Sequence, residues 1–149
     1  MPIYRKILVA TDGSALSQKA VRTAASLAKL NDAALTIFYA APSYPPSTYV
    51  KDLFLSYGPR IRLAKEAELH ARRLLQKAAN SMRRIGIRPT LKFLVGPYPA
   101  AAILQFAAKL KPDLIVMGHR GHRPLPQLLL GGTTREVLAR WRGAVLVVR

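Results

Sequence analysis

The chain has 149 residues, of which 50% are hydrophobic, so we expect one compact domain with a full hydrophobic core over residues 1–149. No apolar run approaches the roughly 18 residues of a membrane span, the N-terminus lacks the pattern of a signal peptide, and the absence of cysteine excludes disulfide and thiolate chemistry. The 24 Lys and Arg residues against 7 Asp and Glu give a net charge of +17, which attracts polyanions such as nucleic acids, acidic lipid headgroups or nucleotides.

Apolar segments of strand length alternate with segments of helical periodicity in the first half of the chain. Lys6–Ala10 is predicted as a strand, and the segment that follows it to Leu30 repeats alanine once per helical turn. A second strand is predicted at Ala34–Ala40. After a Pro- and Tyr-rich connection at residues 41–59, apolar residues at three- and four-residue spacing predict a long amphipathic helix that ends at Met82.

The same alternation continues to the C-terminus. A strand is predicted at Thr90–Val95, and an apolar helix leads from it to a fourth strand at Leu114–Met117. A helix from Thr134 to about Trp141 follows, and Ala144–Val148 forms a fifth strand. Apolar strands separated by helices predict an α/β fold, a single doubly wound, Rossmann-like parallel sheet of five strands with helices on both faces.

The most informative motif is Gly118-His119-Arg120-Gly121, followed after nine further residues by Gly131-Gly132-Thr133-Thr134. The first glycine pair falls where the fourth strand ends. Thr133 and Glu136 have the spacing of a capping box, with Thr133 as N-cap, so the second pair is expected at a helix N-terminus. Free N–H groups and the positive end of the helix dipole meet there, and glycine lets an oxyanion approach the backbone. The motif predicts a phosphate-binding loop, and the alternative is that its glycines only serve tight turns.

A second distinctive turn, Asp12-Gly13-Ser14, directly follows the first strand and so lies at the same edge of the sheet, where doubly wound folds bind ligands. Asp12 is an acceptor that suits sugar hydroxyls or a bound Mg²⁺, and its alternative role is a helix N-cap. Arg120 is able to reach a phosphate as a forked donor or else faces solvent. Asp113 precedes its strand, which predicts a structural or solvent-facing role at the opposite edge.

Over nearly its whole length the chain resembles a universal stress protein of the nucleotide-binding type. The segment from Ile7 to Ser14 is similar to the opening strand and acidic turn of that family, and the segment from Asp113 to Gly118 is similar to the approach to its ATP loop. The family pattern is glycine, two residues, glycine, nine residues, glycine, then serine or threonine.

Gly118, Gly121 and Gly131 match this pattern in spacing, but Gly132 stands where the family has a hydroxyl. The departure removes one side-chain donor and leaves the phosphates to backbone N–H groups and Thr133. The affinity is therefore expected to be lower than the resemblance alone implies.

The resemblance implies ATP as the ligand, with Mg²⁺ as a companion ion and AMP or a cyclic nucleotide as alternatives. It implies that Asp12 holds the ribose or adenosine end and that the backbone near Ala40 and Ala41 meets the adenine edge. The phosphates would be surrounded by the residues of the glycine motif, Gly118, Gly121, Gly131, Gly132 and Thr133, and Arg120 and Thr134 complete the candidate site. The family also implies a role in stress tolerance and a homodimer that pairs through the last strand, whose edge no later element covers.

Catalysis is not predicted, because the chain lacks both Gly-x4-Gly-Lys-Ser/Thr and Gly-x-Gly-x-x-Gly, and no carboxylate besides Asp12 is placed to activate water. We expect a cytoplasmic, nucleotide-responsive binding protein with little or no ATP hydrolysis, and no membrane partner. The alternative function is polyanion binding, in which nucleic acid is the partner and the ATP loop is inactive. Cations gathered on one face would favour that alternative, whereas cations spread over the surface would favour plain solvation.

Overall fold

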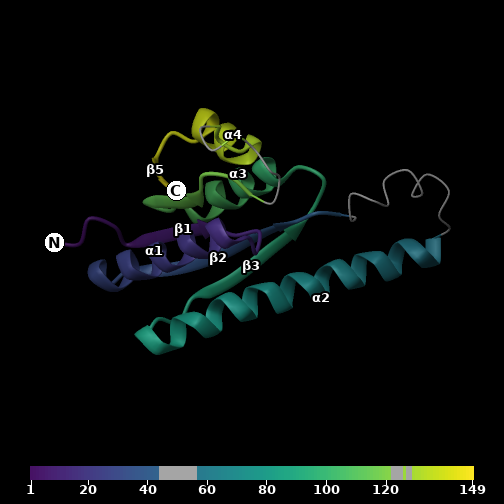
Figure 1. Ribbon diagram of the computed structural model, residues 1–149, viewed down its shortest axis with the longest axis horizontal. Helices are drawn as coiled ribbons and strands as arrows, with labels where there is room; N and C mark the ends of the chain where they lie inside the picture. Colours follow the sequence, from purple (N-terminus) through teal and green to yellow (C-terminus); the bar gives the residue numbers. More distant parts are fainter. Residues whose placement is uncertain (44–56, 122–125, 127–128) are drawn as a thin grey trace.

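The computed structural model describes residues 1–43, 57–121, 126 and 129–149, with only the backbone of residues 57–61. Its strands are β1 (Lys6–Ala10), β2 (Ala34–Ala41), β3 (Thr90–Val95), β4 (Leu114–Gly118) and β5 (Ala144–Val148). All neighbouring strands are parallel, and the five form one sheet in the order β3-β2-β1-β4-β5 (Figure 1). The order reverses between β1 and β4, so the predicted doubly wound α/β fold is confirmed.

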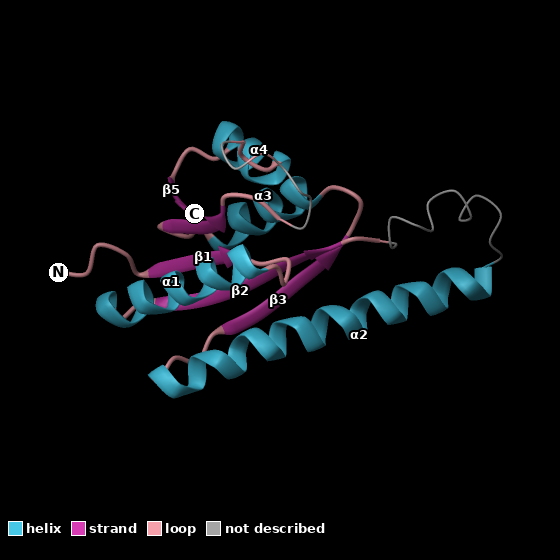
Figure 2. Cartoon of the chain, viewed as in Figure 1, coloured by secondary structure: helices cyan, strands magenta, loops and turns pink. Residues whose placement is uncertain are grey.

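Helices cover both faces of this sheet (Figure 2). They are α1 (Ala15–Asn31), α2 (Tyr57–Met82), the short 3-10 turn η3 (Arg83–Ile85), α3 (Pro99–Leu110) and α4 (Gly132–Arg140). Buried side chains of α1 and α2 pack on one face, and those of α3 and α4 pack on the other. No helix in the described ranges is long and apolar enough to cross a membrane.

The two cores follow from the alternation of side chains along each strand. Ile7 and Val9 of β1 point to the α1 and α2 side, whereas Leu8 points to the α3 side, and all three are fully buried. Phe38 of β2 stacks on Phe106 of α3, with ring centroids 4.8 Å apart. Because all the strands are parallel, their carboxyl ends lie at one common edge of the sheet.

Asp113 lies at the opposite, amino edge, as predicted. Its Oδ2 accepts hydrogen bonds from the backbone N–H groups of Arg5 (2.7 Å) and Lys6 (2.8 Å), where the chain enters β1. These two bonds are the main reason that the pKa of the Asp113 carboxyl lies below its ordinary value. Asp113 therefore ties the start of β4 to the start of β1.

The structure corrects several predicted boundaries. The Pro- and Tyr-rich connection is shorter than residues 41–59, because β2 continues through Ala41 and α2 begins at Tyr57; its interior lies outside the described residues.

The predicted capping box is wrong. Gly131, in an extended conformation, is the N-cap of α4, and the Glu136 carboxylate instead pairs with Arg140 at 2.9 Å.

Candidate functional site

A cavity of about 410 Å³ opens at the carboxyl edge of β1, β2 and β4, where the strand order reverses. Its volume falls in the range of about 300–1,000 Å³ typical of ligand pockets. Segments far apart in sequence line it: the β1–α1 turn, the end of β2, the segment from Gly96 to Pro99, the loop after β4 and the first turn of α4. Doubly wound folds bind ligands at this position.

The predicted site residues gather around this cavity with one exception. Those that line it are Asp12, Ala40, Gly118, Arg120, Gly121, Gly131, Gly132, Thr133 and Thr134. Ala41 does not line it, since its side chain is buried in the core on the α1 and α2 side. The Ala41 carbonyl accepts a 2.9 Å hydrogen bond from the N–H of Gly96, which joins β2 to the turn after β3. Ala41 therefore offers no side chain to the cavity, and the contact of its backbone with adenine stays a prediction.

The β1–α1 turn presents Asp12 to the cavity. Ser14, not Asp12, is the N-cap of α1, with its hydroxyl accepting from the N–H of Ser17 at 3.2 Å. Asp12 Oδ1 accepts a 2.9 Å bond from the N–H of Ser14, which fixes the carboxylate against the turn. Its N-cap alternative is thus wrong.

Gly121 faces the same carboxylate from the loop after β4. A Cβ built on Gly121 would collide with Oδ2 of Asp12, so any side chain there would displace the carboxylate or the loop. Asp12 and Gly121 lie in the loops that follow β1 and β4, the two strands that flank the switch point. The absence of a side chain at Gly121 is what lets the two loops meet.

The other glycines of the motif differ in what surrounds them. A Cβ on Gly118 would lie 3.3 Å from the carbonyl carbon of Leu16, and one on Gly131 would lie 3.1 Å from the Cα of Arg120. Both glycines therefore permit close backbone packing, which supports the structural alternative at these two positions. A Cβ on Gly132 would meet no atom within 4 Å, so this position alone could take a larger residue without rearrangement.

The N-terminus of α4 points its donors toward the cavity. The N-cap residue Gly131 has no side chain with which to cap α4, and the first turn of the helix, Gly132 to Thr134, has backbone N–H groups without intrahelical acceptors. The buried Thr134 hydroxyl donates a 2.8 Å hydrogen bond to the Gly118 carbonyl, which fixes α4 on the end of β4. Thr133 is partly exposed in the cavity wall, so it is the available hydroxyl beside Gly132.

The side chains around the loop divide into buried and lining groups. Arg120 is partly exposed and lines the cavity, whereas the His119 side chain is buried and does not line it. The backbone N–H of His119 donates a 2.8 Å hydrogen bond to the Val148 carbonyl. His122 and Arg123 of the same loop lie outside the described residues. Arg120 is therefore the cation that the described part of the loop offers to a ligand.

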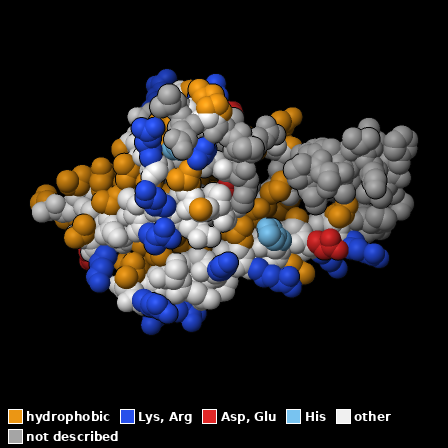
Figure 3. Space-filling view, in the orientation of Figure 1, with side chains coloured by type: hydrophobic (Ala, Val, Ile, Leu, Met, Phe, Trp, Pro, Cys, Tyr) orange, Lys and Arg blue, Asp and Glu red, His pale blue; other side chains and the backbone are white. Residues whose placement is uncertain are grey.

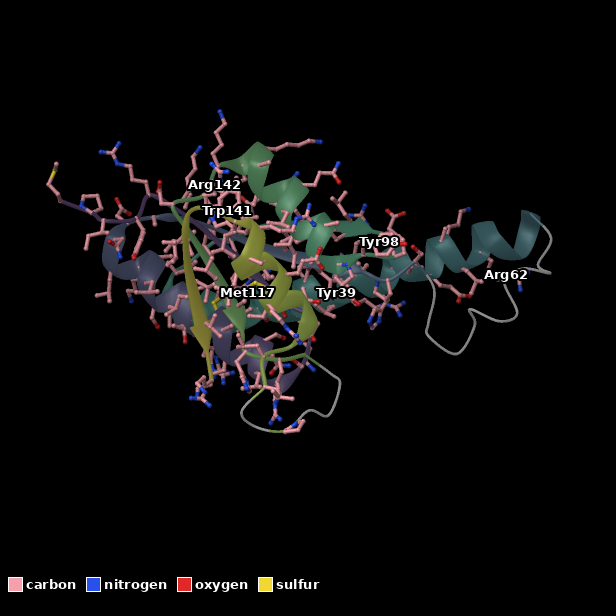
Figure 4. The ribbon with its side chains drawn as sticks, turned by 90° about the horizontal axis from the view of Figure 1, so that it is seen from above. Tyr39, Arg62, Tyr98, Met117, Trp141 and Arg142 are labelled. Atoms are coloured by element: carbon pink, nitrogen blue, oxygen red, sulfur yellow. The ribbon has the colours of Figure 1, made fainter. Side chains whose placement is uncertain are left out.

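Tyr39 and Met117 line the cavity but carry no signal in the sequence that marks them as site residues. Figure 4 shows Met117, from β4, close to α4, while Tyr98 lies at the start of α3, further from that helix. Burial raises the pKa of the Tyr39 hydroxyl, and the negative charge of Asp12 raises it further. Tyr39 therefore remains a neutral phenol, able to donate a hydrogen bond, throughout the physiological range.

Thr11, Ser17 and the Gly96-Pro97 turn are further lining residues that the sequence analysis did not single out. The Thr11 and Ser17 hydroxyls lie 3.0 Å apart and are both buried, so they stabilise the β1–α1 turn. The Gly96-Pro97 signal was available, because this dipeptide directly follows a strand, as the Asp12 turn does. How close this turn lies to Asp12 depends on the strand order, which places β3 two positions from β1.

Exposed Lys and Arg residues occur on both faces of the protein. They include Lys19, Arg22, Arg73 and Lys77 on α1 and α2, and Lys109, Arg135 and Arg140 on α3 and α4. The described surface thus carries cations on both layers of helices, which favours a solvated basic surface over one dedicated polyanion-binding face.

The fold and cavity together define a doubly wound α/β domain with a ligand-sized pocket at its switch point. A model of the universal stress protein family matches residues 3–149, and the chain belongs to this family. Universal stress protein MJ0531 of Methanocaldococcus jannaschii is 33% identical over 151 aligned residues, which cover 99% of this chain and 83% of that protein. A universal stress protein of Thermus aquaticus is 31% identical and covers 99% of this chain and 100% of its own length.

Solved structures share the same architecture. Universal stress protein UspA from Lactobacillus plantarum superposes with a TM-score of 0.79 at 22% identity, covering 98% of each chain, which shows the shared fold. A universal stress protein in complex with cAMP has a TM-score of 0.66 at 26% identity and covers 98% of this chain and 97% of its own. One from Archaeoglobus fulgidus in complex with dAMP has a TM-score of 0.64 at 25% identity and covers 99% of both chains.

Proposed function

We propose that the protein binds an adenine nucleotide, with ATP as the leading candidate, in the cavity at the carboxyl edge of the sheet. The observation that carries this proposal is the uncapped N-terminus of α4 beside Gly121 and Gly131, which offers backbone donors and a positive dipole end in a ligand-sized cavity. Such a site suits phosphate oxygens. The similarity to family members in complex with cAMP and dAMP supports an adenine nucleotide in particular.

The chemistry of the lining suggests how the nucleotide lies. Phosphates belong at the donor end, against Gly132 and Thr133, with Arg120 as a charged partner. Asp12 suits the ribose hydroxyls, or a Mg²⁺ that accompanies the triphosphate, because its carboxylate is an acceptor. The adenine then occupies the wall formed by Ala40 and the segment from Gly96 to Pro99.

We further propose a binding role rather than an enzymatic one. Asp12 is the single carboxylate among the described residues that line the cavity, and it is already hydrogen bonded to the turn. A general base also has to hold a water in line with the phosphate under attack, and the described lining residues include no histidine or second carboxylate for that role. ATP turnover is therefore expected to be slow or absent, in keeping with a nucleotide-responsive protein of stress tolerance in the cytoplasm.

The same proposal includes a homodimer that pairs through β5. This strand is an edge of the sheet, and its partly buried residues Val145, Leu146, Val147 and Val148 leave an apolar margin beside unpaired backbone groups. Light scattering at micromolar concentration is expected to give twice the mass of the chain. A monomer under those conditions would contradict the dimer and leave the nucleotide site untouched.

Mass spectrometry of nucleotide released from the purified protein, followed by calorimetry with ATP and Mg²⁺, tests the site. We expect an adenine nucleotide to co-purify, or ATP to bind after its removal, with a rise in melting temperature. ADP, AMP and cyclic AMP titrations then rank the alternatives. Folded protein that gives neither heat nor a thermal shift with millimolar concentrations of all four would overturn the assignment.

A further inference from the structure

A second cavity, also of about 410 Å³, lies between α1 and α2, on the face of the sheet opposite α3 and α4. Its walls come from the first turns of α1, from Gln18 to Arg22, and from the C-terminal half of α2, from His70 to Ser81. Gly13, in the β1–α1 turn, also lines this cavity. We call it the α1–α2 groove, and its size equals that of the cavity at the sheet edge.

Three cations line the α1–α2 groove from both helices. Arg22 comes from α1, and Arg73 and Lys77 come from successive turns of α2; all three are exposed. None of them forms an ion pair with a described residue, and no carboxylate is among the lining residues. Figure 3 shows Lys and Arg side chains over this side of the molecule, with acidic side chains at only a few points.

The two acidic residues of α2 that precede the groove do not line it. Glu68 pairs with Arg72 at 2.8 Å on a neighbouring face, and Glu66 lies four residues before His70, beyond the lining residues. Arg73 and Lys77 stand four residues apart on α2, a like-charge spacing that destabilises a helix unless an anion lies between the charges. The groove is therefore electrostatically complementary to an anion.

The interior of the groove is apolar. Val21 of α1 and Leu74 and Ala78 of α2 line it and belong to, or pack against, the core on this face. Leu74 also packs under the β1–α1 turn, because a Cβ built on Gly13 would lie 3.0 Å from Leu74 Cδ1. A free inorganic anion would contact the cations but gain nothing from this surface, whereas a neutral apolar molecule would leave the cations unpaired.

We propose that the α1–α2 groove binds a small organic anion with an apolar body, such as a medium-chain carboxylate, as a site separate from the nucleotide cavity. The anionic head contacts Arg22, Arg73 and Lys77, and the apolar body lies along Val21, Leu74 and Ala78. The two cavities share one wall, since Thr11 lines both. Tyr39 of the nucleotide cavity and His70 of the groove also contact each other edge to face, with ring centroids 6.3 Å apart.

Fluorescence titration with 8-anilinonaphthalene-1-sulfonate, a sulfonate on an aromatic body, tests the groove directly. We expect saturable binding to the folded wild type, displacement by decanoate, and no displacement by inorganic phosphate. The double variant Arg73→Glu/Lys77→Glu is expected to raise the Kd for both ligands about tenfold or more, equivalent to about 1.4 kcal/mol. Ala78→Phe, which fills the groove without changing its charge, is expected to do the same.

The matched control is Arg83→Glu/Arg84→Glu, which changes the net charge equally at exposed positions outside the groove. It is expected to leave both Kd values within about twofold of the wild type, and thermal melts establish that each variant is folded. Equal losses in the two double variants would mean diffuse attraction and would overturn the proposal. Displacement of the probe by ATP, or no saturable binding to the folded wild type, would overturn it too.

Discussion

The two edges of the sheet use the same side chain in different ways. At the amino edge, both partners of Asp113 are backbone N–H groups of the chain entering β1, and one carboxylate oxygen takes both bonds. At the carboxyl edge, Asp12 Oδ1 accepts a hydrogen bond from the Ser14 N–H, and its Oδ2 lies against Gly121 in the loop after β4. The first carboxylate joins two strands, whereas the second borders a cavity. The role of each aspartate therefore depends on whether it precedes or follows its strand.

The largest expected effect comes from closing the gap between the two loops at the carboxyl edge. Gly121→Val would force a branched side chain into Oδ2 of Asp12 and disturb both loops at once. ATP affinity is expected to fall at least about 100-fold, or about 2.7 kcal/mol, by calorimetry. Ala108→Val is the control, because it adds a branched side chain at an exposed position of α3 that does not line the cavity. Unchanged ATP binding in folded Gly121→Val would contradict the assigned site.

A gain of affinity is expected from restoring the family hydroxyl. Gly132→Ser places a donor in open space at the first position of α4, where no neighbouring atom has to move. One charge-assisted hydrogen bond is worth about 1.5 to 3 kcal/mol, so affinity for ATP is expected to rise by up to about two decades. Gly132→Ala separates the hydroxyl from the added Cβ. If both variants bind like the wild type, Thr133 already supplies the donor.

Replacing each aspartate by asparagine tests whether the two edges of the sheet differ in function. Asp12→Asn keeps an oxygen for the Ser14 N–H but removes the charge, and it is expected to weaken ATP binding about tenfold in the presence of Mg²⁺. Asp113→Asn makes the same chemical change at the other edge and is expected to leave the Kd unchanged. Calorimetry on both variants decides this, and equal effects would mean that net charge, and not position, governs affinity.

The smallest effect is expected in acid stability. The pKa of Asp113 in the folded protein lies below its ordinary value of 3.8, so its stabilisation is complete above that value and is lost as pH falls through the lower folded pKa. Melting temperatures measured from pH 7 to pH 2 should therefore fall more steeply below about pH 4 in the wild type than in Asp113→Ala. Parallel curves would show that Asp113 is not linked to folding.

Most of the fold was predictable because its signals are local. β3 and β5 match the predicted bounds, and the fourth strand gains only Gly118. A short apolar run between two helical segments shows directly where a strand begins and ends. The capping box failed for a reason that is not local. The Thr134 hydroxyl bonds to a carbonyl sixteen residues away, at Gly118, and this contact fixes where α4 begins.

The candidate site was predictable where a turn directly follows a strand, as at Asp12 and Gly118. It was not predictable at Tyr39 or Ser17, because their place in the cavity wall depends on the order of strands and on which side chains α1 brings close. The side chain of Ala41 points away from the cavity that Ala40 lines, because one residue along a strand moves a side chain to the other face. Long-range geometry, rather than local pattern, therefore determined what was missed.

The anchoring of α4 has a consequence for the dynamics of the cavity. Only two residues of this helix are buried, Thr134 and Val137, compared with six in α1. Segments with few buried contacts open locally at a lower free energy than the whole protein unfolds. The amide protons of α4 should then exchange with solvent through such openings, while those of β1 and β4 await global unfolding. The backbone donors that face the cavity therefore lie on a short helix that two buried residues hold against the sheet.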